Sequence, residues 1–314
     1  MLINLIPAFL DVLRSPDRVA AYHRVFEAHR PVFSAYWRNY VMDPESAAAE
    51  ALLARALAAD RSDLEALVAQ VDVAALAEDG LRRAAEHLKP DAFVDCYLMV
   101  GMGQANAGEL VIGGRGIVFI CVEHFTGRPN PETMGLGLDP ALIPMWVAHE
   151  VAHVVRYTGL HSRSELKRLV AEAGGHYDFW DTGRRATLRE LLLNEGLAVH
   201  AAQAAAPGHE RHTYFGYTRR QYQRLRESEA FLRRAVARDL DRAALGLRLR
   251  WLSDGMSPAA RLVGGRVLPE RSGYYLGARM SEALVGSVGI AEALRAAPAE
   301  FEAAERKARG IETA

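Results

Sequence analysis

The chain has 314 residues and a formal net charge of −1, and half of its residues are apolar. This length and composition suffice for one large hydrophobic core or for two closely packed ones. The near-neutral charge gives no reason to expect nucleic acid as a partner. Two cysteines, Cys96 and Cys121, are too few for a disulfide framework and too far apart for a thiolate metal site.

The first residues, MLINLIPAFLDVLRSPDR, are apolar but contain no basic segment and no small-residue cleavage site. We therefore expect no export signal. No stretch of the sequence approaches the roughly 20 apolar residues that a membrane-spanning helix needs. The expectation is a cytoplasmic protein with no membrane partner.

Helical periodicity dominates the sequence from residue 1 to about residue 90. Apolar residues recur three and four positions apart with charges between them, as in ESAAAEALLARALAA, and breaks fall at Pro31, Pro44 and Asp60. This pattern predicts amphipathic helices of a packed region. We expect residues 1–92 to form a helical N-terminal region that packs on a core of residues 93–314.

A small sheet is predicted next, because β-branched and aromatic residues cluster between glycines. Strands are expected near residues 93–100, 109–113 and 116–123, with a tight turn at Gly113 and Gly114 between the last two. The strand in GIVFICVEHF is a weak candidate for an edge to which an extended peptide adds.

The segment PMWVAHEVAHVV follows a loop rich in glycine and proline. Pro144 is expected in the first turn of a helix and Gly159 at a left-handed C-cap. Residues four apart share one face of a helix, so His149 and His153 can direct imidazole nitrogens at one point. Glu150 lies about 100° around the same helix, close enough to reach a water on a metal ion without binding the ion itself.

The alternative to a zinc site is a buried helix that carries three polar residues by chance, since so short a motif is not rare. Burial of two histidines and a glutamate among valines and alanines is costly unless something satisfies them. A metal ion does so, and we therefore favour zinc.

A third ligand is expected downstream, because a catalytic zinc ion usually has three protein ligands and one open position. A metzincin would need glycine at position 156 and histidine at 159, where this chain has Arg156 and Gly159. The candidate is Glu195, in the apolar segment RELLLNEGLAVHAA. TLRE at residues 187–190 is a capping box that predicts the start of its helix.

This segment resembles the third-ligand helix of the gluzincins, and LNEGLA resembles the aminopeptidase N family pattern. The order of helical region, short sheet, HExxH, NEGLA and a late GYYLG is most similar to a little-characterised bacterial group of predicted zinc-dependent proteases. The resemblance implies that His149, His153 and Glu195 bind one Zn²⁺ and that Glu150 is the general base and acid of peptide hydrolysis.

The chain departs from the best-known gluzincins in three respects. The gap between the two ligand helices is longer than in aminopeptidase N relatives, and Val199 occupies the place where thermolysin-like enzymes have an aspartate. GMGQANAG is a poor match to the segment with which aminopeptidase N relatives hold a free amino terminus. Exopeptidase specificity is therefore not supported.

Several other polar residues could assist the site. Tyr274, with Tyr275 as the alternative, is the candidate that stabilises the oxyanion, although tyrosines packed at a helix start are an equal possibility. His200 is expected to be an ordinary, partly buried histidine. Glu123 and His124 are expected at the surface or in a loop rather than as ligands.

The sequence as a whole predicts a mainly helical α+β protein with a gluzincin-like, thermolysin-like zinc peptidase core. Its expected function is zinc-dependent hydrolysis of a peptide or protein substrate, in which Glu150 deprotonates the water and Tyr274 steadies the oxyanion. Two alternatives remain: a catalytically idle zinc-binding regulatory or interaction protein, and a metal-free helical module. The arginines of residues 211–250 alternate with acids, which favours a solvated helix face over nucleic-acid contact.

Overall fold

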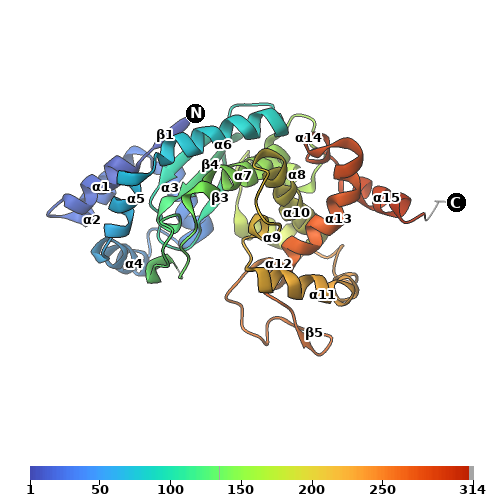
Figure 1. The fold of residues 1–314 in the computed structure, drawn as a ribbon. Coiled ribbons are helices and arrows are strands. Elements are labelled where there is room, and N and C mark those ends of the chain that lie inside the picture. Colours follow the sequence, from blue (N-terminus) through green and yellow to red (C-terminus); the bar gives the residue numbers. More distant parts are fainter. Residues whose placement is uncertain (134, 311–314) are drawn as a thin grey trace.

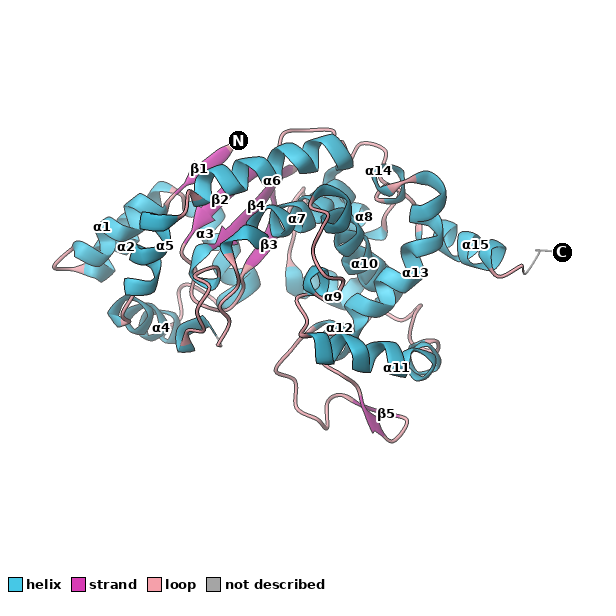
Figure 2. Cartoon of the chain, in the orientation of Figure 1, coloured by secondary structure: helices cyan, strands magenta, loops and turns pink. Residues whose placement is uncertain are grey.

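The computed structural model describes residues 1–133 and 135–310. It shows a mainly helical α+β fold in which a small sheet and helices α6 and α7 lie between the N-terminal and C-terminal groups of helices (Figures 1 and 2). The strands are β1 (Leu2–Asn4), β2 (Asp95–Met99), β3 (Ala107–Ile112), β4 (Arg115–Cys121), β5 (Leu262–Val263) and β6 (Arg266–Val267). The helices are α1 (Ile6–Arg14), α2 (Arg18–Ala28), α3 (Arg30–Tyr36), α4 (Ala47–Ala58), α5 (Ser62–Gln70), α6 (Val73–Leu88), α7 (Ile143–Thr158), α8 (Glu165–Glu172), α9 (Phe179–Arg185), α10 (Leu188–Ala205), α11 (Arg219–Val236), α12 (Leu245–Leu252), α13 (Ser272–Val288), α14 (Ile290–Ala293) and α15 (Pro298–Ala308).

The main sheet has the strand order β1-β2-β4-β3. Strands β1, β2 and β4 are parallel, and β3 is antiparallel to β4. The three predicted strands are confirmed, whereas β1 was missed because three residues are too few to show a period. Its partner in the sheet, β2, lies more than 90 residues away in the sequence. The predicted N-terminal region thus contributes a strand to the sheet, and a domain boundary at residue 92 stays a prediction.

The turn between β3 and β4 has the predicted glycines in left-handed conformations, with φ of +59° at Gly113 and +80° at Gly114. The expectation that residues 116–123 form a sheet edge was wrong, because β4 lies between β2 and β3. The edge strands are β1 and β3, and polar groups of other segments already bond the outer side of β3. The Tyr40 hydroxyl is hydrogen-bonded to the backbone of Glu109, and the Tyr177 N–H donates to the carbonyl of Val111.

Helix α7 is the central element, packed against β3, β4, α6 and α10. Glycines permit two of these close contacts: a side chain at Gly116 of β4 would overlap Val154, and one at Gly80 of α6 would lie 2.8 Å from Val147. Pro144 lies in the first turn, as predicted. The prediction of a left-handed end at Gly159 was wrong, since its φ is −55° and its N–H instead bonds the carbonyl of Val155.

Helices α10 and α13 cross in direct backbone contact. A Cβ atom on Gly277 would overlap the carbonyl of Leu192, and one on Gly196 would overlap the backbone of Gly277. Gly196 directly follows Glu195, so this crossing determines where the expected third ligand lies. Small residues at both positions let the two helix backbones approach more closely than ordinary side chains would allow.

The start of α10 keeps half of the predicted capping box. Thr187 accepts the N–H of Glu190 at 3.3 Å, but the Glu190 carboxylate does not return to the Thr187 N–H. It pairs with Arg156 of α7 instead, and both side chains are fully buried. The Thr187 N–H is satisfied by Glu165 at 3.0 Å.

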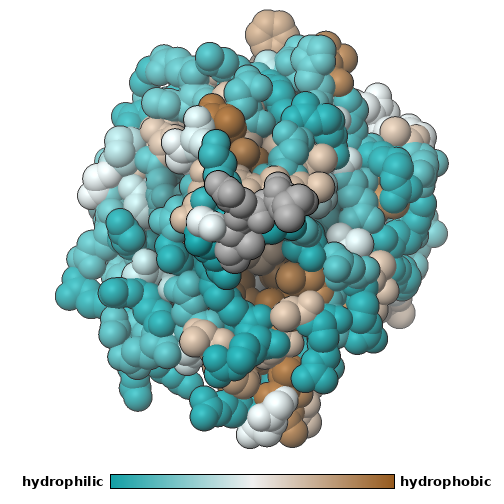
Figure 3. Space-filling view, turned by 90° about the vertical axis from the view of Figure 1, so that its right-hand side faces the viewer, coloured by the Kyte–Doolittle hydropathy of each residue, from teal (hydrophilic) through white to brown (hydrophobic). Residues whose placement is uncertain are grey.

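The arginine-rich segment forms two helices, α11 and α12, rather than one continuous helix. Acids neutralise several of its arginines, for example Arg233, which pairs with Glu229 and with Glu305 of α15. The face of the molecule on this C-terminal side is mostly hydrophilic, with a few apolar residues near its centre (Figure 3). Among the described residues, no helix has the length and apolar composition that crossing a bilayer requires.

We predict that Gly277→Ala lowers the free energy of unfolding by about 2–4 kcal/mol, because the methyl group has no space at the helix crossing. Gly286→Ala on the same helix is the matched control, since nothing lies within 4 Å of its Cβ position. That variant should be neutral or more stable by up to about 1 kcal/mol. Urea unfolding measures the free energy of unfolding of both variants. Equal changes in Gly277→Ala and Gly286→Ala would contradict the close crossing of α10 and α13.

Candidate metal centre

The side chains of His149 and His153 on α7 and of Glu195 on α10 lie close together. The Oε2 atom of Glu195 lies 3.7 Å from Nε2 of His149 and 3.6 Å from Nε2 of His153. A tetrahedral zinc ion with bonds of about 2.0–2.1 Å holds its ligand atoms roughly 3.3–3.4 Å apart. The Glu195 oxygen is therefore within a few tenths of an ångström of the required distance from each imidazole, and all three ligand atoms lie within 4.8 Å of one another, so the group can hold one metal ion.

The polar atoms of this group are buried without partners among the described residues. Oε2 of Glu195 and Nδ1 of His149 and His153 have no hydrogen bond, although both histidines are only 3% exposed. An unpaired buried polar atom is costly, and a metal ion would remove that cost for the Glu195 oxygen. Ring packing orients the imidazoles instead: Trp146 lies against His149, and Tyr157 stacks on His153.

The electrostatic environment favours the protonation states that a metal ligand needs. Burial, more than any other influence, lowers the pKa of His149 below its ordinary range, although the Glu195 carboxylate acts in the opposite direction. Burial raises the pKa of Glu195, but the nearby imidazoles of His153 and His149 outweigh it and bring this pKa to about 2. A neutral imidazole and an ionised carboxylate are the metal-binding forms.

Glu150 is 4% exposed and shares its surroundings with a second carboxyl group, that of Glu109 on β3. Burial raises the pKa of Glu150 well above its ordinary range, and the charges of Glu109 and Glu195 raise it further. Carboxyl oxygens of Glu109 and Glu150 lie within 4.8 Å of each other. Two buried carboxyl groups in contact are stable when one of them carries a proton.

Two tyrosine hydroxyls hold Glu109 in place. Tyr40, on a π-helical turn, donates to Oε2 at 2.8 Å, and Tyr157 of α7 donates to Oε1 at 2.8 Å. The Tyr157 hydroxyl in turn accepts a hydrogen bond from Asn194, the residue before Glu195. A continuous hydrogen-bond network therefore connects the third-ligand helix, the HExxH helix and the edge strand.

Glu109, Glu150 and His153 also lie close enough together to form a metal-binding group of their own. This group shares His153 with the first one. Both Glu109 oxygens already accept hydrogen bonds from tyrosines, whereas the Glu195 oxygen accepts none. His149, His153 and Glu195 are therefore the group with a free carboxylate oxygen for a metal ion. Two imidazoles and one carboxylate are a donor set that suits zinc.

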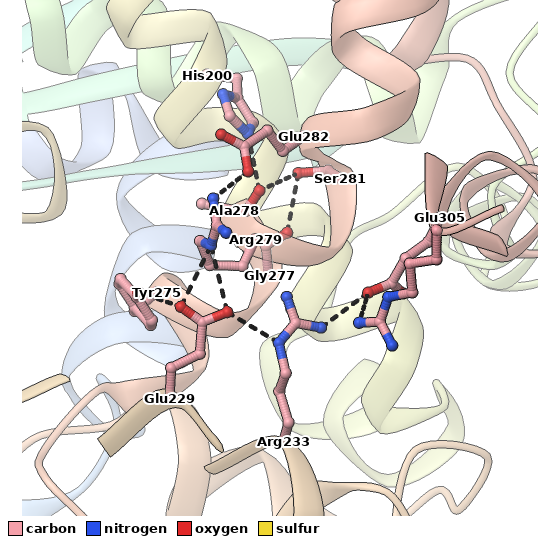
Figure 4. Close-up of polar contacts among 11 residues, drawn as sticks. His200, Glu229, Arg233, Tyr275, Gly277, Ala278, Arg279, Ser281, Glu282 and Glu305 are labelled. Atoms are coloured by element: carbon pink, nitrogen blue, oxygen red, sulfur yellow. Dashed lines mark hydrogen bonds and ion pairs between the residues drawn. The ribbon is translucent and has the colours of Figure 1, made fainter. Parts of the chain in front are cut away.

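The structure separates the two tyrosines that the sequence left as alternatives. The ring of Tyr274 stacks on His149, with centroids 6.4 Å apart and an interplanar angle of 17°. The hydroxyl of Tyr275 points to another face of α13 and donates to Glu229 at 2.6 Å (Figure 4). Tyr274 therefore lies beside the triad, whereas Tyr275 belongs to a separate polar network.

That network borders a surface cavity of about 890 Å³, lined by residues that include His200, Tyr275, Arg279 and Glu282. None of the metal-binding side chains lines it. His200 is half-buried and bonds the carbonyl of Ala278 at 2.9 Å, in agreement with the expectation of an ordinary histidine (Figure 4). Glu229 is paired with Arg233 and Arg279 there, so its charge is neutralised locally.

The expected surface position of Glu123 and His124 was wrong, although neither is a ligand, as expected. Glu123 and His124 are fully buried rather than exposed, at 1% and 0%. Glu123 accepts the backbone N–H groups of Gly101 and Gly103, which gives it a role in holding the loop after β2. Neither residue belongs to a metal-binding group of the described part of the chain.

Sequence reasoning missed Glu109 and Arg271. Glu109 had a signal, since it is one carboxylate inside the otherwise apolar strand AGELVI, the same argument that identified Glu195. Arg271 had none, because its guanidinium reaches the site by stacking on Tyr274, 4.3 Å from the ring centre. That contact depends on how α13 packs, which no local pattern shows.

We predict that protein purified without chelator carries about one zinc ion per chain, and that chelation lowers its melting temperature. His153→Ala should lose most of the bound zinc, because it removes one of three ligands. His200→Ala, which changes a histidine outside the triad, should keep it. Elemental analysis with thermal unfolding tests this, and full zinc occupancy in His153→Ala would contradict the site.

No protein-family model, no curated protein and no solved structure matches the chain. The geometry of the site therefore carries the functional argument.

Proposed function

We propose that this protein is a zinc-dependent peptidase with a gluzincin-like arrangement of ligand helices. One observation carries the proposal: Glu195 of α10 brings its Oε2 within 3.7 Å of both HExxH imidazoles, with the Glu150 carboxyl beside them. Three protein ligands leave the fourth position of a tetrahedral ion open, which is typical of catalytic rather than structural zinc. The proposed substrate is a peptide or protein.

Bound zinc would supply a water of lowered pKa and would polarise the scissile carbonyl. Glu150 is the group placed to accept the proton of that water and to return it to the leaving amine. The ordinary pKa of a glutamate is too low for efficient return of a proton near neutral pH. Burial and the charge of Glu109 raise the pKa of Glu150, which favours the protonated form that this second task needs, whereas bound zinc would lower the same pKa and favour the ionised form that the first task needs.

Tyr274 is the proposed donor to the oxyanion. Burial and the charge of Glu195 raise the pKa of its hydroxyl well above the ordinary range, so the phenol keeps its proton. Its ring stacks on His149, which keeps it beside the triad. A neutral, positioned O–H donor next to the metal ion can stabilise charge that develops on the carbonyl oxygen.

Glu109 is the proposed positioning residue for Glu150. Its two tyrosine partners hold its carboxyl group, and an oxygen of that group lies within 4.8 Å of a Glu150 carboxyl oxygen. A general base on a helix of this kind has several rotamers, and a fixed hydrogen-bond partner selects one of them.

We predict that zinc-loaded Glu150→Gln loses at least about 100-fold in kcat against a peptide library, because the amide cannot accept the proton. Its zinc content should equal that of the unchanged protein, since Glu150 is not a ligand. Mass-spectrometric cleavage profiling measures the effect. Retention of both zinc and full activity would refute the mechanism, and inactivity of the zinc-loaded natural chain on every peptide would favour a catalytically idle zinc-binding protein.

Glu109→Gln should lower kcat by roughly 10-fold with little change in KM, since it disturbs the orientation of Glu150 rather than substrate binding. Zinc content should be unchanged. Glu229→Gln is the control, a partly buried glutamate hydrogen-bonded to Tyr275 on another face of α13. Steady-state kinetics on a cleaved peptide measures both variants, and an effect of Glu109→Gln on KM alone would contradict the positioning role.

A further inference from the structure

Arg271 stands at the start of α13, directly beside the proposed metal centre. Its guanidinium lies 4.3 Å from the ring centre of Tyr274, and that ring stacks on His149. Its positive charge lowers the pKa of both His149 and Glu150. Arg271 and Tyr274 are both partly exposed, whereas the histidines beneath them are buried. The arginine therefore lies where solvent and substrate can reach the site.

This guanidinium has no acidic partner among residues 1–133 and 135–310. Arg279 on the same helix pairs with Glu229 and Glu282, and Arg261 before it pairs with Glu270. Arg248, the other cation near the triad, is held by the Phe179 carbonyl and the Tyr177 hydroxyl. Arg271 instead stacks on the rings of Tyr217 and Tyr274, and no carboxylate of the described residues occupies its guanidinium, whose planar fork suits a planar anion.

The backbone of Arg271 is held in an unfavourable conformation. Its φ is +52°, in the left-handed region where a glycine would avoid a cost of about 1 kcal/mol. The Tyr217 hydroxyl donates to the Arg271 carbonyl at 2.6 Å and so fixes this conformation. An arginine at a position that favours glycine is consistent with a use of its side chain.

The charge around the site adds to this argument. Three carboxylates, those of Glu109, Glu150 and Glu195, face two guanidinium groups and a divalent ion, so the loaded site carries excess positive charge. Helix α13 has no side-chain cap, so the positive end of its dipole lies at Arg271 as well. A negatively charged substrate group would neutralise the excess positive charge and would interact favourably with the positive end of the α13 dipole.

We propose that Arg271 binds the free C-terminal carboxylate of the substrate, so that the enzyme releases residues from the C-terminus of peptides. The inference rests on the proposed function, because it assigns the substrate class of the same site. A bidentate guanidinium–carboxylate contact recognises a terminal carboxylate and rejects a terminal amide. Each residue of an extended peptide spans about 3.5 Å, so a carboxylate on Arg271 places a bond near the chain end at the metal ion.

The test compares N-acetylated peptides that differ only in a free C-terminal carboxylate or a C-terminal amide. The natural chain should prefer the acid in kcat/KM by at least about 10-fold. Arg271→Met should abolish that preference, and Arg271→Lys should keep part of it. Arg266→Met is the matched control, since Arg266 also stacks on an aromatic ring, 5.2 Å from the centre of Phe231, but lies on β6. It should leave the preference unchanged.

A binding measurement separates this inference from the proposed function. Zinc-loaded Glu150→Gln should bind N-acetyl-trialanine more tightly than its amide in calorimetry, and the added change Arg271→Met should remove the difference. This outcome would support Arg271 even if no peptide were hydrolysed. The inference is overturned if acid and amide behave alike with the natural Arg271, or if Arg271→Met weakens both equally, which a purely structural role would produce.

Discussion

The burial of charge in an apolar interior is the constraint on which the rest of this structure depends. Helix α7 is buried over nearly its whole length, yet it carries His149, Glu150, His153 and Arg156. Each of these groups would be costly without a partner. The neighbouring elements supply the partners: α10 brings Glu190 to Arg156 and Glu195 to the histidines, and β3 brings Glu109 to Glu150.

Such partners are effective only when the helices are held closely together. The crossing of α10 and α13 at Gly196 and Gly277 fixes one side of the site, and the contact of Gly116 with Val154 fixes the other. The same crossing places Tyr274 over His149 and turns Tyr275 toward a different surface. Packing at positions without side chains therefore decides which polar residues reach the metal centre.

The buried polar residues fall into two groups, those that connect elements of the fold and those that lie at the candidate metal centre. The Arg156–Glu190 pair and the backbone contacts of Glu123 connect elements inside the protein, although Nε of Arg156 and Oε2 of Glu190 have no hydrogen bond to any described residue. Among the described residues, Oε2 of Glu195 and Nδ1 of His149 and His153 have no hydrogen bond, and Arg271 has no acidic partner. Incompletely satisfied groups that converge on one place are typical of a site that binds something from outside.

The sequence by itself determined the α+β class, three of the four strands of the main sheet, and the common face of His149 and His153, because each of these follows from periodicity within one element. It also identified Glu195, since a carboxylate in an apolar helix needs a partner. Only the tertiary structure revealed β1, the interior position of β4, the pairing of Glu190 with Arg156 and the places of Glu109 and Arg271. These features depend on contacts between segments far apart in the sequence, and close packing at glycines decides such contacts without leaving a periodic pattern.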